Sequence, residues 1–206
     1  NMGLKSHMLF YVMDKELKDS TATMASKSDS PLNEAIRELR KEHGSNIVIF
    51  SDVCLCTGTD HGHCGVLEGE RIANDKTVKE LVRIALSNAE AGVDYIALSD
   101  MMDGRVSEVR GALEEGGYHE TGILSYSVKY ASSFYGPFRG AASSSPEFGD
   151  RKSHQMDVRS GYGEAILEAL QDEKEGADII MIKPGLPYLD VLKVVSDEVL
   201  RPVAVY

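Results

Sequence analysis

Residues 46–53 read Asn-Ile-Val-Ile-Phe-Ser-Asp-Val, residues 76–91 read Lys-Thr-Val-Lys-Glu-Leu-Val-Arg-Ile-Ala-Leu-Ser-Asn-Ala-Glu-Ala, and residues 94–99 read Asp-Tyr-Ile-Ala-Leu-Ser. The first and last of these are short, nearly continuous apolar runs, typical of strands that are buried on both faces of a parallel sheet. The middle segment places apolar residues three and four positions apart, as an amphipathic helix does. Together they predict a strand–helix–strand unit of a parallel α/β fold.

The same alternation continues along the chain. Further strands are predicted at residues 6–12, 122–127, 178–182 and 202–205, and further helices at residues 31–43, 105–115, 161–175 and 188–200. No G-x-G-x-x-G sequence follows the first strand, which disfavours an open dinucleotide-binding sheet and favours a (β/α)8 TIM barrel. We therefore predict a single TIM-barrel catalytic domain over residues 1–206, represented by about six of the eight βα units. Residue 1 is Asn and Tyr206 directly follows an apolar run, so both ends are expected to be incomplete.

Composition narrows the classes of function. The chain has 206 residues, of which 42% are hydrophobic and 27% charged, and its formal net charge is −11. Such a charge repels phosphate backbones and anionic lipids, so we expect neither nucleic acid nor a membrane as partner. No apolar stretch approaches the roughly 20 residues of a membrane helix, and residues 1–14 lack a signal-peptide pattern. A cytoplasmic protein that acts on small molecules or assembles with other subunits is expected.

All three cysteines lie close together after a predicted strand. Cys54, Cys56 and Cys64 fall within 11 residues, an odd number too tightly grouped for a disulfide framework. Three thiolates would leave one tetrahedral position of Zn²⁺ open, which is the arrangement of a catalytic site. Three ordinary buried thiols are the alternative. His61 and His63 in the same loop are candidate further ligands or acid/base groups, or residues that only support the ligands.

Two lysines end or follow otherwise apolar strands. Lys129 follows the strand predicted at 122–127, and Lys183 follows the strand predicted at 178–182. In a barrel both side chains would reach the catalytic face. Burial and a neighbouring cation can bring the pKa of a lysine down from about 10.4 toward 7 or 8, which makes the amine a nucleophile toward carbonyl groups. The alternative for each is an ordinary surface lysine whose stem lies along the fold.

Two further segments are rich in polar and aromatic groups. Residues 99–105 read Ser-Asp-Met-Met-Asp-Gly-Arg at a strand end, where they would hold a polar substrate or, alternatively, cap the next helix through Ser99 or Asp103. Residues 134–139 read Phe-Tyr-Gly-Pro-Phe-Arg and combine aromatic walls with a guanidinium suited to a carboxylate, although they could equally form an aromatic plug. Arg151, Lys152 and Gln155 extend this candidate anion-binding region.

In their order along the chain, these motifs resemble the porphobilinogen synthase family, also called δ-aminolevulinic acid dehydratase. The resemblance runs over nearly the whole chain and rests on residues 52–65, 99–105, 125–139, 149–156 and 181–190. It implies a (β/α)8 barrel, usually assembled as a homo-octamer. It also implies the condensation of two 5-aminolevulinate molecules to porphobilinogen with loss of two waters, in tetrapyrrole (heme) biosynthesis.

The resemblance also assigns roles to residues. It implies a Schiff base on Lys183 with the substrate that becomes the propionate side, and one on Lys129 with the substrate that becomes the acetate side. It further implies zinc on the three cysteines, and cysteines in place of aspartates indicate the zinc-using branch. The remaining implied roles are orientation of substrate and protons by Asp52 and Ser99, pocket walls at Tyr135 and Phe138, a lid meeting a carboxylate with Arg139, Arg151 and Gln155, and an allosteric magnesium at Glu168.

The chain departs from the family pattern at three positions. Gly58 replaces an aromatic in the zinc loop, Leu98 stands where proline is usual, and His154 stands where tyrosine is common. Glu168 also fits an ordinary solvated helix charge. Two other functions remain open from the sequence. One is another Schiff-base aldolase-type barrel, disfavoured by the clustered cysteines, and the other is a non-catalytic zinc-binding or assembly subunit of the same fold.

Overall fold

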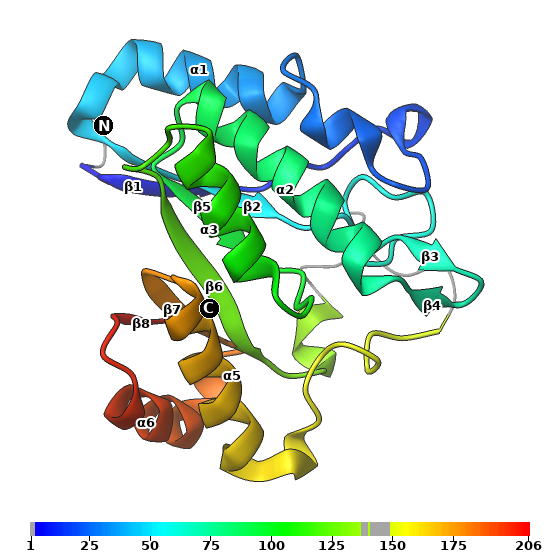
Figure 1. Ribbon diagram of the computed structural model, residues 1–206, viewed down its shortest axis with the longest axis vertical. Helices are drawn as coiled ribbons and strands as arrows, with labels where there is room; N and C mark the ends of the chain where they lie inside the picture. Colours follow the sequence, from blue (N-terminus) through cyan, green and yellow to red (C-terminus); the bar gives the residue numbers. More distant parts are fainter. Residues whose placement is uncertain (1–2, 137–139, 141–148) are drawn as a thin grey trace.

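A computed structural model describes residues 3–136, 140 and 149–206, so Phe138 and Arg139 lie outside the described residues. Six strands form one sheet in the order β1-β2-β5-β6-β7-β8, with every neighbouring pair parallel (Figure 1). They are β1 (Ser6–Leu9), β2 (Val48–Val53), β5 (Tyr95–Leu98), β6 (Gly122–Lys129), β7 (Ile179–Lys183) and β8 (Val203–Val205). Since chain order and spatial order agree throughout, the sheet has none of the order reversal of a doubly wound fold. This is the topology predicted for a barrel.

Side chains from all six strands meet on the inner side of the sheet. One apolar cluster contains Met8, Phe50, Ala97, Leu124, Tyr126, Ile179, Met181 and Ala204. Two contacts join strands that are not neighbours: the Tyr126 hydroxyl donates to the Met8 sulfur at 3.3 Å, and the rings of Phe10 and Tyr206, beyond β1 and β8, lie 6.1 Å apart. The sheet is therefore strongly curved around a packed interior, as in a TIM barrel.

Within the described residues, five helices lie along the sheet between the strands, and each packs against the next one (Figure 1). They are α1 (Pro31–His43), α2 (Asn74–Ala91), α3 (Arg105–Glu115), α5 (Gly161–Glu175) and α6 (Leu189–Glu198). The connections contain short 3-10 helices at Lys15–Leu17, Thr23–Ser26, Gly44–Asn46, Ser133–Tyr135, Val158–Ser160 and Leu186–Tyr188. A hairpin of β3 (Leu67–Glu68) and β4 (Arg71–Ile72), which the sequence did not predict, lies just before α2. Within the described residues, no helix is long and apolar enough to cross a membrane.

Two matching arginine–aspartate contacts join the helices to the strands. Arg40 of α1 pairs with Asp94 at 2.6 Å, and Arg110 of α3 pairs with Asp178 at 2.5 Å. Each aspartate lies just before a strand, and the same carboxylate oxygen accepts a hydrogen bond from the backbone N–H of the strand before it, at Ile49 and at Ile123. Each contact therefore holds a helix and two strands in register at the amino-terminal end of the sheet.

We predict that Asp178→Asn lowers the free energy of unfolding by about 1–2 kcal/mol, because the amide keeps one acceptor but loses the charged contact with Arg110. Urea unfolding with an unchanged m-value measures this loss. Lys193→Met serves as the control, because Lys193 pairs with Asp197 at the surface, where it is 71% exposed. That substitution is expected to change stability by less than about 0.5 kcal/mol. Equal effects of the two substitutions would contradict the prediction.

Candidate functional site

Polar residues replace the apolar interior at the carboxyl ends of the strands. Asp52 follows the interior residue Phe50 by two positions, and Lys183 follows Met181 in the same way. Alternate residues of a strand share a face, so both polar side chains point to the inside of the curved sheet. Ser99 stands in the same relation to Ala97 on β5 and is buried. A polar layer therefore lies directly on the apolar interior, at the end of the sheet where barrel enzymes carry their active sites.

A β-bulge brings Lys129 into this layer. Ser125 pairs with Ile180 and Val128 with Ile182, so β6 contains one residue more than β7 between these two pairs. In a regular strand, residues 125, 127 and 129 would share one face, so Lys129 would point the same way as Ser125, whose hydroxyl points to α5. With the extra residue, Lys129 lies opposite Lys183 in the register of the two strands. The bulge therefore places two lysines side by side.

The two amines share a largely aromatic environment. Lys129 and Lys183 are 6% and 4% exposed, and their Nζ atoms lie 5.6 Å and 5.4 Å from the centre of the Tyr126 ring. The Lys129 amine donates a hydrogen bond to the Ser99 carbonyl, and the Lys183 Nζ lies 3.6 Å from the centre of the Tyr206 ring. Burial, together with the nearby charge of Lys129, lowers the pKa of Lys183 to about 8. Lys183 is thus prepared to act as a nucleophile near neutral pH.

Asp52 is the carboxyl group that faces the amines. Burial raises its pKa to about 6, and this rise is opposed by a hydrogen bond from Ser99 and by the charges of Lys129 and Lys183. Within the described part of the chain, its Oδ1 has no hydrogen-bond partner. A carboxyl group whose pKa lies near neutrality can both give and receive protons.

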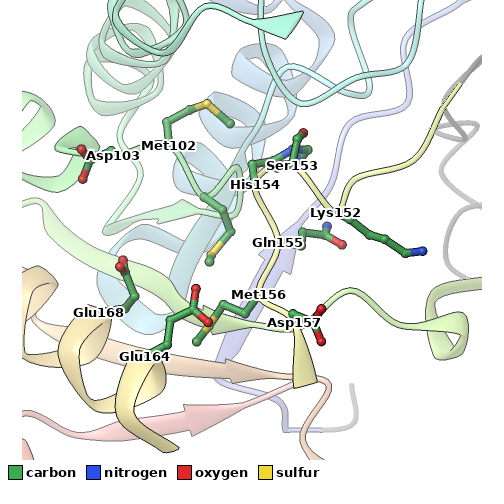
Figure 2. Close-up of a pocket in the computed structure, with 11 residues that line it drawn as sticks. Met102, Asp103, Lys152, Ser153, His154, Gln155, Met156, Asp157, Glu164 and Glu168 are labelled. Carbon is green, nitrogen blue, oxygen red and sulfur yellow. The ribbon is translucent and has the colours of Figure 1, made fainter. Parts of the chain in front are cut away.

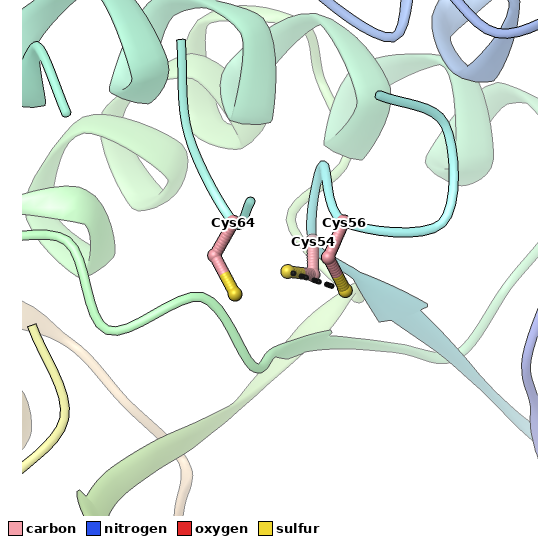
Figure 3. A group of neighbouring side chains, drawn as sticks. All are labelled: Cys54, Cys56 and Cys64. Carbon is pink, nitrogen blue, oxygen red and sulfur yellow. Dashed lines mark hydrogen bonds between the residues drawn. The ribbon is translucent and has the colours of Figure 1, made fainter. Parts of the chain in front are cut away.

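The three cysteines converge immediately beyond β2 (Figure 3). All are buried, the sulfurs of Cys54 and Cys56 lie 3.3 Å apart, and the three sulfurs lie within 4.8 Å of one another. A tetrahedral zinc ion with Zn–S bonds of about 2.3 Å requires sulfurs roughly 3.8 Å apart, so the cluster fits such an ion after small adjustments. Hydrogen bonds from the thiols of Cys54 and Cys56 hold the pKa of Cys64 well below its usual range. Among the described residues, no other group of three or more potential metal ligands lies within such reach, and neither His61 nor His63 belongs to this one.

The candidate anion-binding residues occupy different positions around the site. Tyr135 is buried, and its hydroxyl donates to the carbonyls of Tyr130, at 2.7 Å, and Lys183, at 3.0 Å. Arg151 is buried beside the cysteines and donates to the Gly62 carbonyl at 3.0 Å. Although burial alone would lower its pKa, the neighbouring Cys64 raises the pKa of Arg151. Arg151 therefore lies close enough to the cysteines to interact with their charge.

A cavity of about 480 Å³ lies next to the site, between the segment that follows β5 and the start of α5 (Figure 2). Gln155 lines it and is buried, and within the described residues neither polar atom of its side chain has a hydrogen-bond partner. Asp103, Glu164 and Glu168 make another part of the lining acidic. Burial first, and then Asp172, raises the pKa of Glu168. The glutamate therefore lies in a partly buried acidic environment rather than on a fully solvated helix face.

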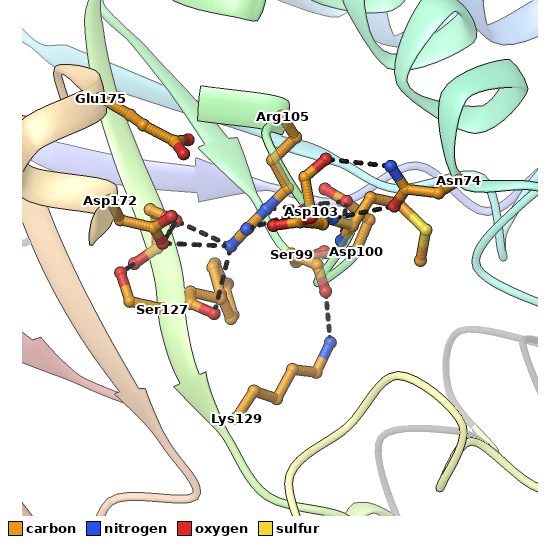
Figure 4. Close-up of polar contacts among 12 residues, drawn as sticks. Asn74, Ser99, Asp100, Asp103, Arg105, Ser127, Lys129, Asp172 and Glu175 are labelled. Carbon is orange, nitrogen blue, oxygen red and sulfur yellow. Dashed lines mark hydrogen bonds and ion pairs between the residues drawn. The ribbon is translucent and has the colours of Figure 1, made fainter. Parts of the chain in front are cut away.

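The side chains of the segment 99–105 do not cap the next helix, which was one of the two roles predicted for the segment from the sequence. Neither Ser99 nor Asp103 caps the following helix, because the N-cap of α3 is Gly104, at φ 71°, and no side chain caps it. Arg105 instead turns inward and contacts the carboxylates of Asp100 and Asp172 (Figure 4). Sequence reasoning also missed Tyr126, whose ring lies close to both amines.

Comparisons with known proteins agree with this arrangement. The family model for delta-aminolevulinic acid dehydratase matches residues 1–206. The chain is 49% identical to the delta-aminolevulinic acid dehydratase of Helicobacter pylori and 48% identical to that of Methanothermobacter thermautotrophicus, and covers 62% and 61% of their lengths. These alignments include 100% and 99% of this chain. The chain therefore spans about three fifths of these relatives.

A solved structure gives the same result for the fold. The delta-aminolevulinic acid dehydratase (porphobilinogen synthase) of Toxoplasma gondii, crystallised with the reaction product porphobilinogen, superposes with a TM-score of 0.92 at 45% identity. The match covers 96% of this chain and 56% of that chain. The curved six-stranded sheet thus corresponds to part of a TIM barrel, and the chain belongs to the delta-aminolevulinic acid dehydratase family.

Proposed function

We propose that this chain carries the catalytic centre of a porphobilinogen synthase, which condenses two molecules of 5-aminolevulinate to porphobilinogen with loss of two waters in tetrapyrrole (heme) biosynthesis. The observation that supports it best is the pairing of Lys129 with Lys183 at the ends of neighbouring strands. Both amines are buried, and a cluster of three cysteines follows β2 at the same end of the sheet. An aldolase-type Schiff-base enzyme needs one such lysine and no thiol cluster.

The two lysines would activate the two substrate ketones. The neutral amine of Lys183 would attack the carbonyl carbon of one molecule, and uptake of one proton with loss of water would leave a protonated imine. Lys129 would form the second imine, and its position opposite Lys183 would bring the two substrates together. An iminium withdraws electrons from the adjacent carbon, so carbon–carbon bond formation becomes accessible near neutral pH.

Asp52 and the cysteines would support this chemistry. The Asp52 carboxyl, with its pKa of about 6, would receive a proton at Oδ1 and return it, while Ser99 orients the carboxyl through a hydrogen bond. Cys54, Cys56 and Cys64 would hold Zn²⁺, which would supply a Lewis acid for the carbonyl group of the second substrate.

The substrate also carries a carboxylate, which needs a cationic or amide partner. Arg151 is buried near the thiols and Gln155 is buried beside the cavity. We propose that these two residues bind the carboxylate together with Arg139. Tyr135 and Phe138 would form the apolar walls of the pocket. The homo-octamer, the cytoplasmic location and magnesium at Glu168 stay predictions. The acidic cavity lining around Glu168 offers the oxygen ligands that magnesium prefers.

The first test is borohydride trapping with 5-aminolevulinate, followed by peptide mass spectrometry. Borohydride reduces an imine to a stable amine on the lysine that formed it, so the expected result is an adduct on Lys183 and a second on Lys129. Because the chain covers 62% of the Helicobacter pylori relative, a hybrid that takes the remaining segments from that relative should be tested in parallel. A folded, zinc-loaded hybrid without adducts and without porphobilinogen formation would favour a non-catalytic zinc-binding or assembly subunit.

A further inference from the structure

We propose that Arg105 is a positioning residue for Lys129, acting through the turn that follows β5 and through β6 itself. The proposal rests on the function proposed above, because it concerns one of the two imine-forming lysines. Arg105 is the first residue of α3, and only 2% of its surface is exposed. Its guanidinium touches neither amine. It instead contacts both parts of the chain that determine where the Lys129 amine lies.

The first of these parts is the turn that carries the hydrogen-bond acceptor of Lys129. The Lys129 amine donates to the Ser99 carbonyl, directly before Asp100 (Figure 4). Asp100 Oδ1 accepts from the backbone N–H of Met102 at 2.8 Å, which closes the turn over Met101, at φ 73°. A non-glycine residue in this left-handed region is strained and needs support from its surroundings.

Arg105 supplies that support from the buried side of the turn. Its Nη1 donates to the Met102 carbonyl at 2.9 Å, and its Nε lies 3.6 Å from Asp100 Oδ1. On the exposed side, the Asn74 side chain forms two hydrogen bonds with the backbone of Asp103, at 2.8 Å and 3.0 Å. The turn is therefore held from both sides, but only the arginine also reaches the strand that carries Lys129.

The second part is β6, on the helix-facing side of the bulge. Arg105 Nη2 donates to the Ser125 hydroxyl at 2.8 Å and lies 3.3 Å from Asp172 Oδ2 on α5. The Ser125 hydroxyl in turn donates to the same carboxylate oxygen at 2.6 Å. Ser125 lies on one side of the irregular segment that redirects Lys129 inward. Arg105 and Asp172 thus hold the strand at the point where the direction of the lysine is decided.

The burial of these charges indicates that they restrict the local conformation of the chain. Asp100 and Asp172 are 0% and 3% exposed, and a buried ion pair often contributes little net stability while restricting the local conformation. The guanidinium fork can contact several acceptors at fixed angles, whereas an ammonium group cannot reproduce that pattern. Arg105→Lys therefore keeps the charge but removes the connection between the turn and the strand.

The test is competitive acetylation of lysine amines with a trace of acetic anhydride, read by peptide mass spectrometry as the ratio of Lys129 to Lys183 labelling. Arg105→Lys and Asp172→Asn are expected to raise this ratio by at least about threefold, because loosening the turn frees the Lys129 amine more often. The matched controls are Arg110→Lys and Asp178→Asn, which alter the other arginine–aspartate pair of α3, at the opposite end of the sheet. The controls are expected to leave the ratio unchanged.

Equal ratios in the Arg105→Lys and Arg110→Lys proteins would overturn the proposal, and so would a uniform rise in the labelling of both lysines. Thermal unfolding of each variant, measured alongside, identifies the variants that fold, and the isosteric Asp172→Asn replaces Arg105→Lys if the latter does not fold. The labelling needs no substrate. Absence of 5-aminolevulinate adducts in the folded, zinc-loaded hybrid would thus count against the proposed function alone, and an unchanged labelling ratio against the positioning role alone.

Discussion

Replacement of Lys183 by methionine is expected to abolish the 5-aminolevulinate adduct at this position and to lower porphobilinogen formation by the hybrid at least about a thousandfold, because the amine that forms the first imine is then missing. Methionine fills a similar volume among the rings of Tyr126, Tyr135 and Tyr206, so the fold should persist. Trapping and turnover are the measurements. Lys193→Met, on the exposed face of α6, should leave both unchanged.

The pH dependence of trapping at Lys183 follows from its lowered pKa. With a pKa of about 8, half of the amine is neutral at pH 8, whereas about 0.3% is neutral for an ordinary lysine with a pKa near 10.5. The initial trapping rate should therefore rise from pH 6 to 8 and level off above pH 9. A rate that continues to rise to pH 10 would show that burial and the charge of Lys129 do not activate this amine. Retention of porphobilinogen formation by the Lys183→Met hybrid would contradict the assignment of Lys183 as an imine-forming lysine.

Much of the fold was predictable because its local signals are strong. The helices at Pro31–His43, Arg105–Glu115 and Gly161–Glu175 have the predicted bounds. For the first of them the reason is clear: Ser30 accepts a hydrogen bond from the Asn33 N–H, Pro31 occupies the first turn, and Gly44 ends the helix. In contrast, α2 begins at Asn74, two residues before the predicted start, where no side chain caps it. The strands of the β3–β4 hairpin have two residues each, too short for any periodicity to predict.

The candidate site was predictable for residues at strand ends. It was less predictable for residues whose position depends on a bulge or on the packing of a helix. Their position at strand ends singled out Lys129 and Lys183. The end of β6 was nevertheless predicted at residue 127 instead of Lys129, because the extra residue of a bulge leaves no periodic signal in the sequence. Asp172 lies in the polar run Gln-Asp-Glu-Lys-Glu, and it was not singled out from the sequence. It nevertheless shares the buried face of α5 with Ala165 and Ala169, at helical spacing, and that spacing was the available signal.

Tyr126 illustrates a limit of sequence reasoning. An aromatic residue in an apolar strand reads as ordinary core, and Tyr126 is fully buried in the interior cluster. Its role near the amines depends on which residues lie opposite it across the curved sheet. That depends on the register of β6 with β7, which local patterns do not determine.

Replacement of Cys64 by serine is expected to lower the affinity of the chain for zinc by at least about a hundredfold, because a serine hydroxyl stays protonated at neutral pH and is a poorer ligand than thiolate. The two remaining thiols, Cys54 and Cys56, lie next to each other, whereas Cys64 reaches the cluster from the other end of the loop. Without Cys64, sulfur ligands would therefore contact the ion from one side only. Competition with a chromogenic chelator measures the affinity, and the thiolate-to-metal absorption of the cobalt-loaded chain reports the number of sulfur ligands.

The matched control for the thiol cluster is His63→Asn, one residue away and also buried. If the three sulfurs are the protein's ligands, the histidine variant should bind zinc as the unchanged chain does, and Cys64→Ser should lose both zinc and sulfur-to-cobalt absorption. Weaker zinc binding by His63→Asn, together with unchanged absorption per bound cobalt ion, would make the histidine the fourth ligand and close the open position that a substrate carbonyl needs. Normal zinc affinity in Cys64→Ser would instead leave the cysteines as ordinary buried thiols, and the proposed Lewis acid would have no site among them.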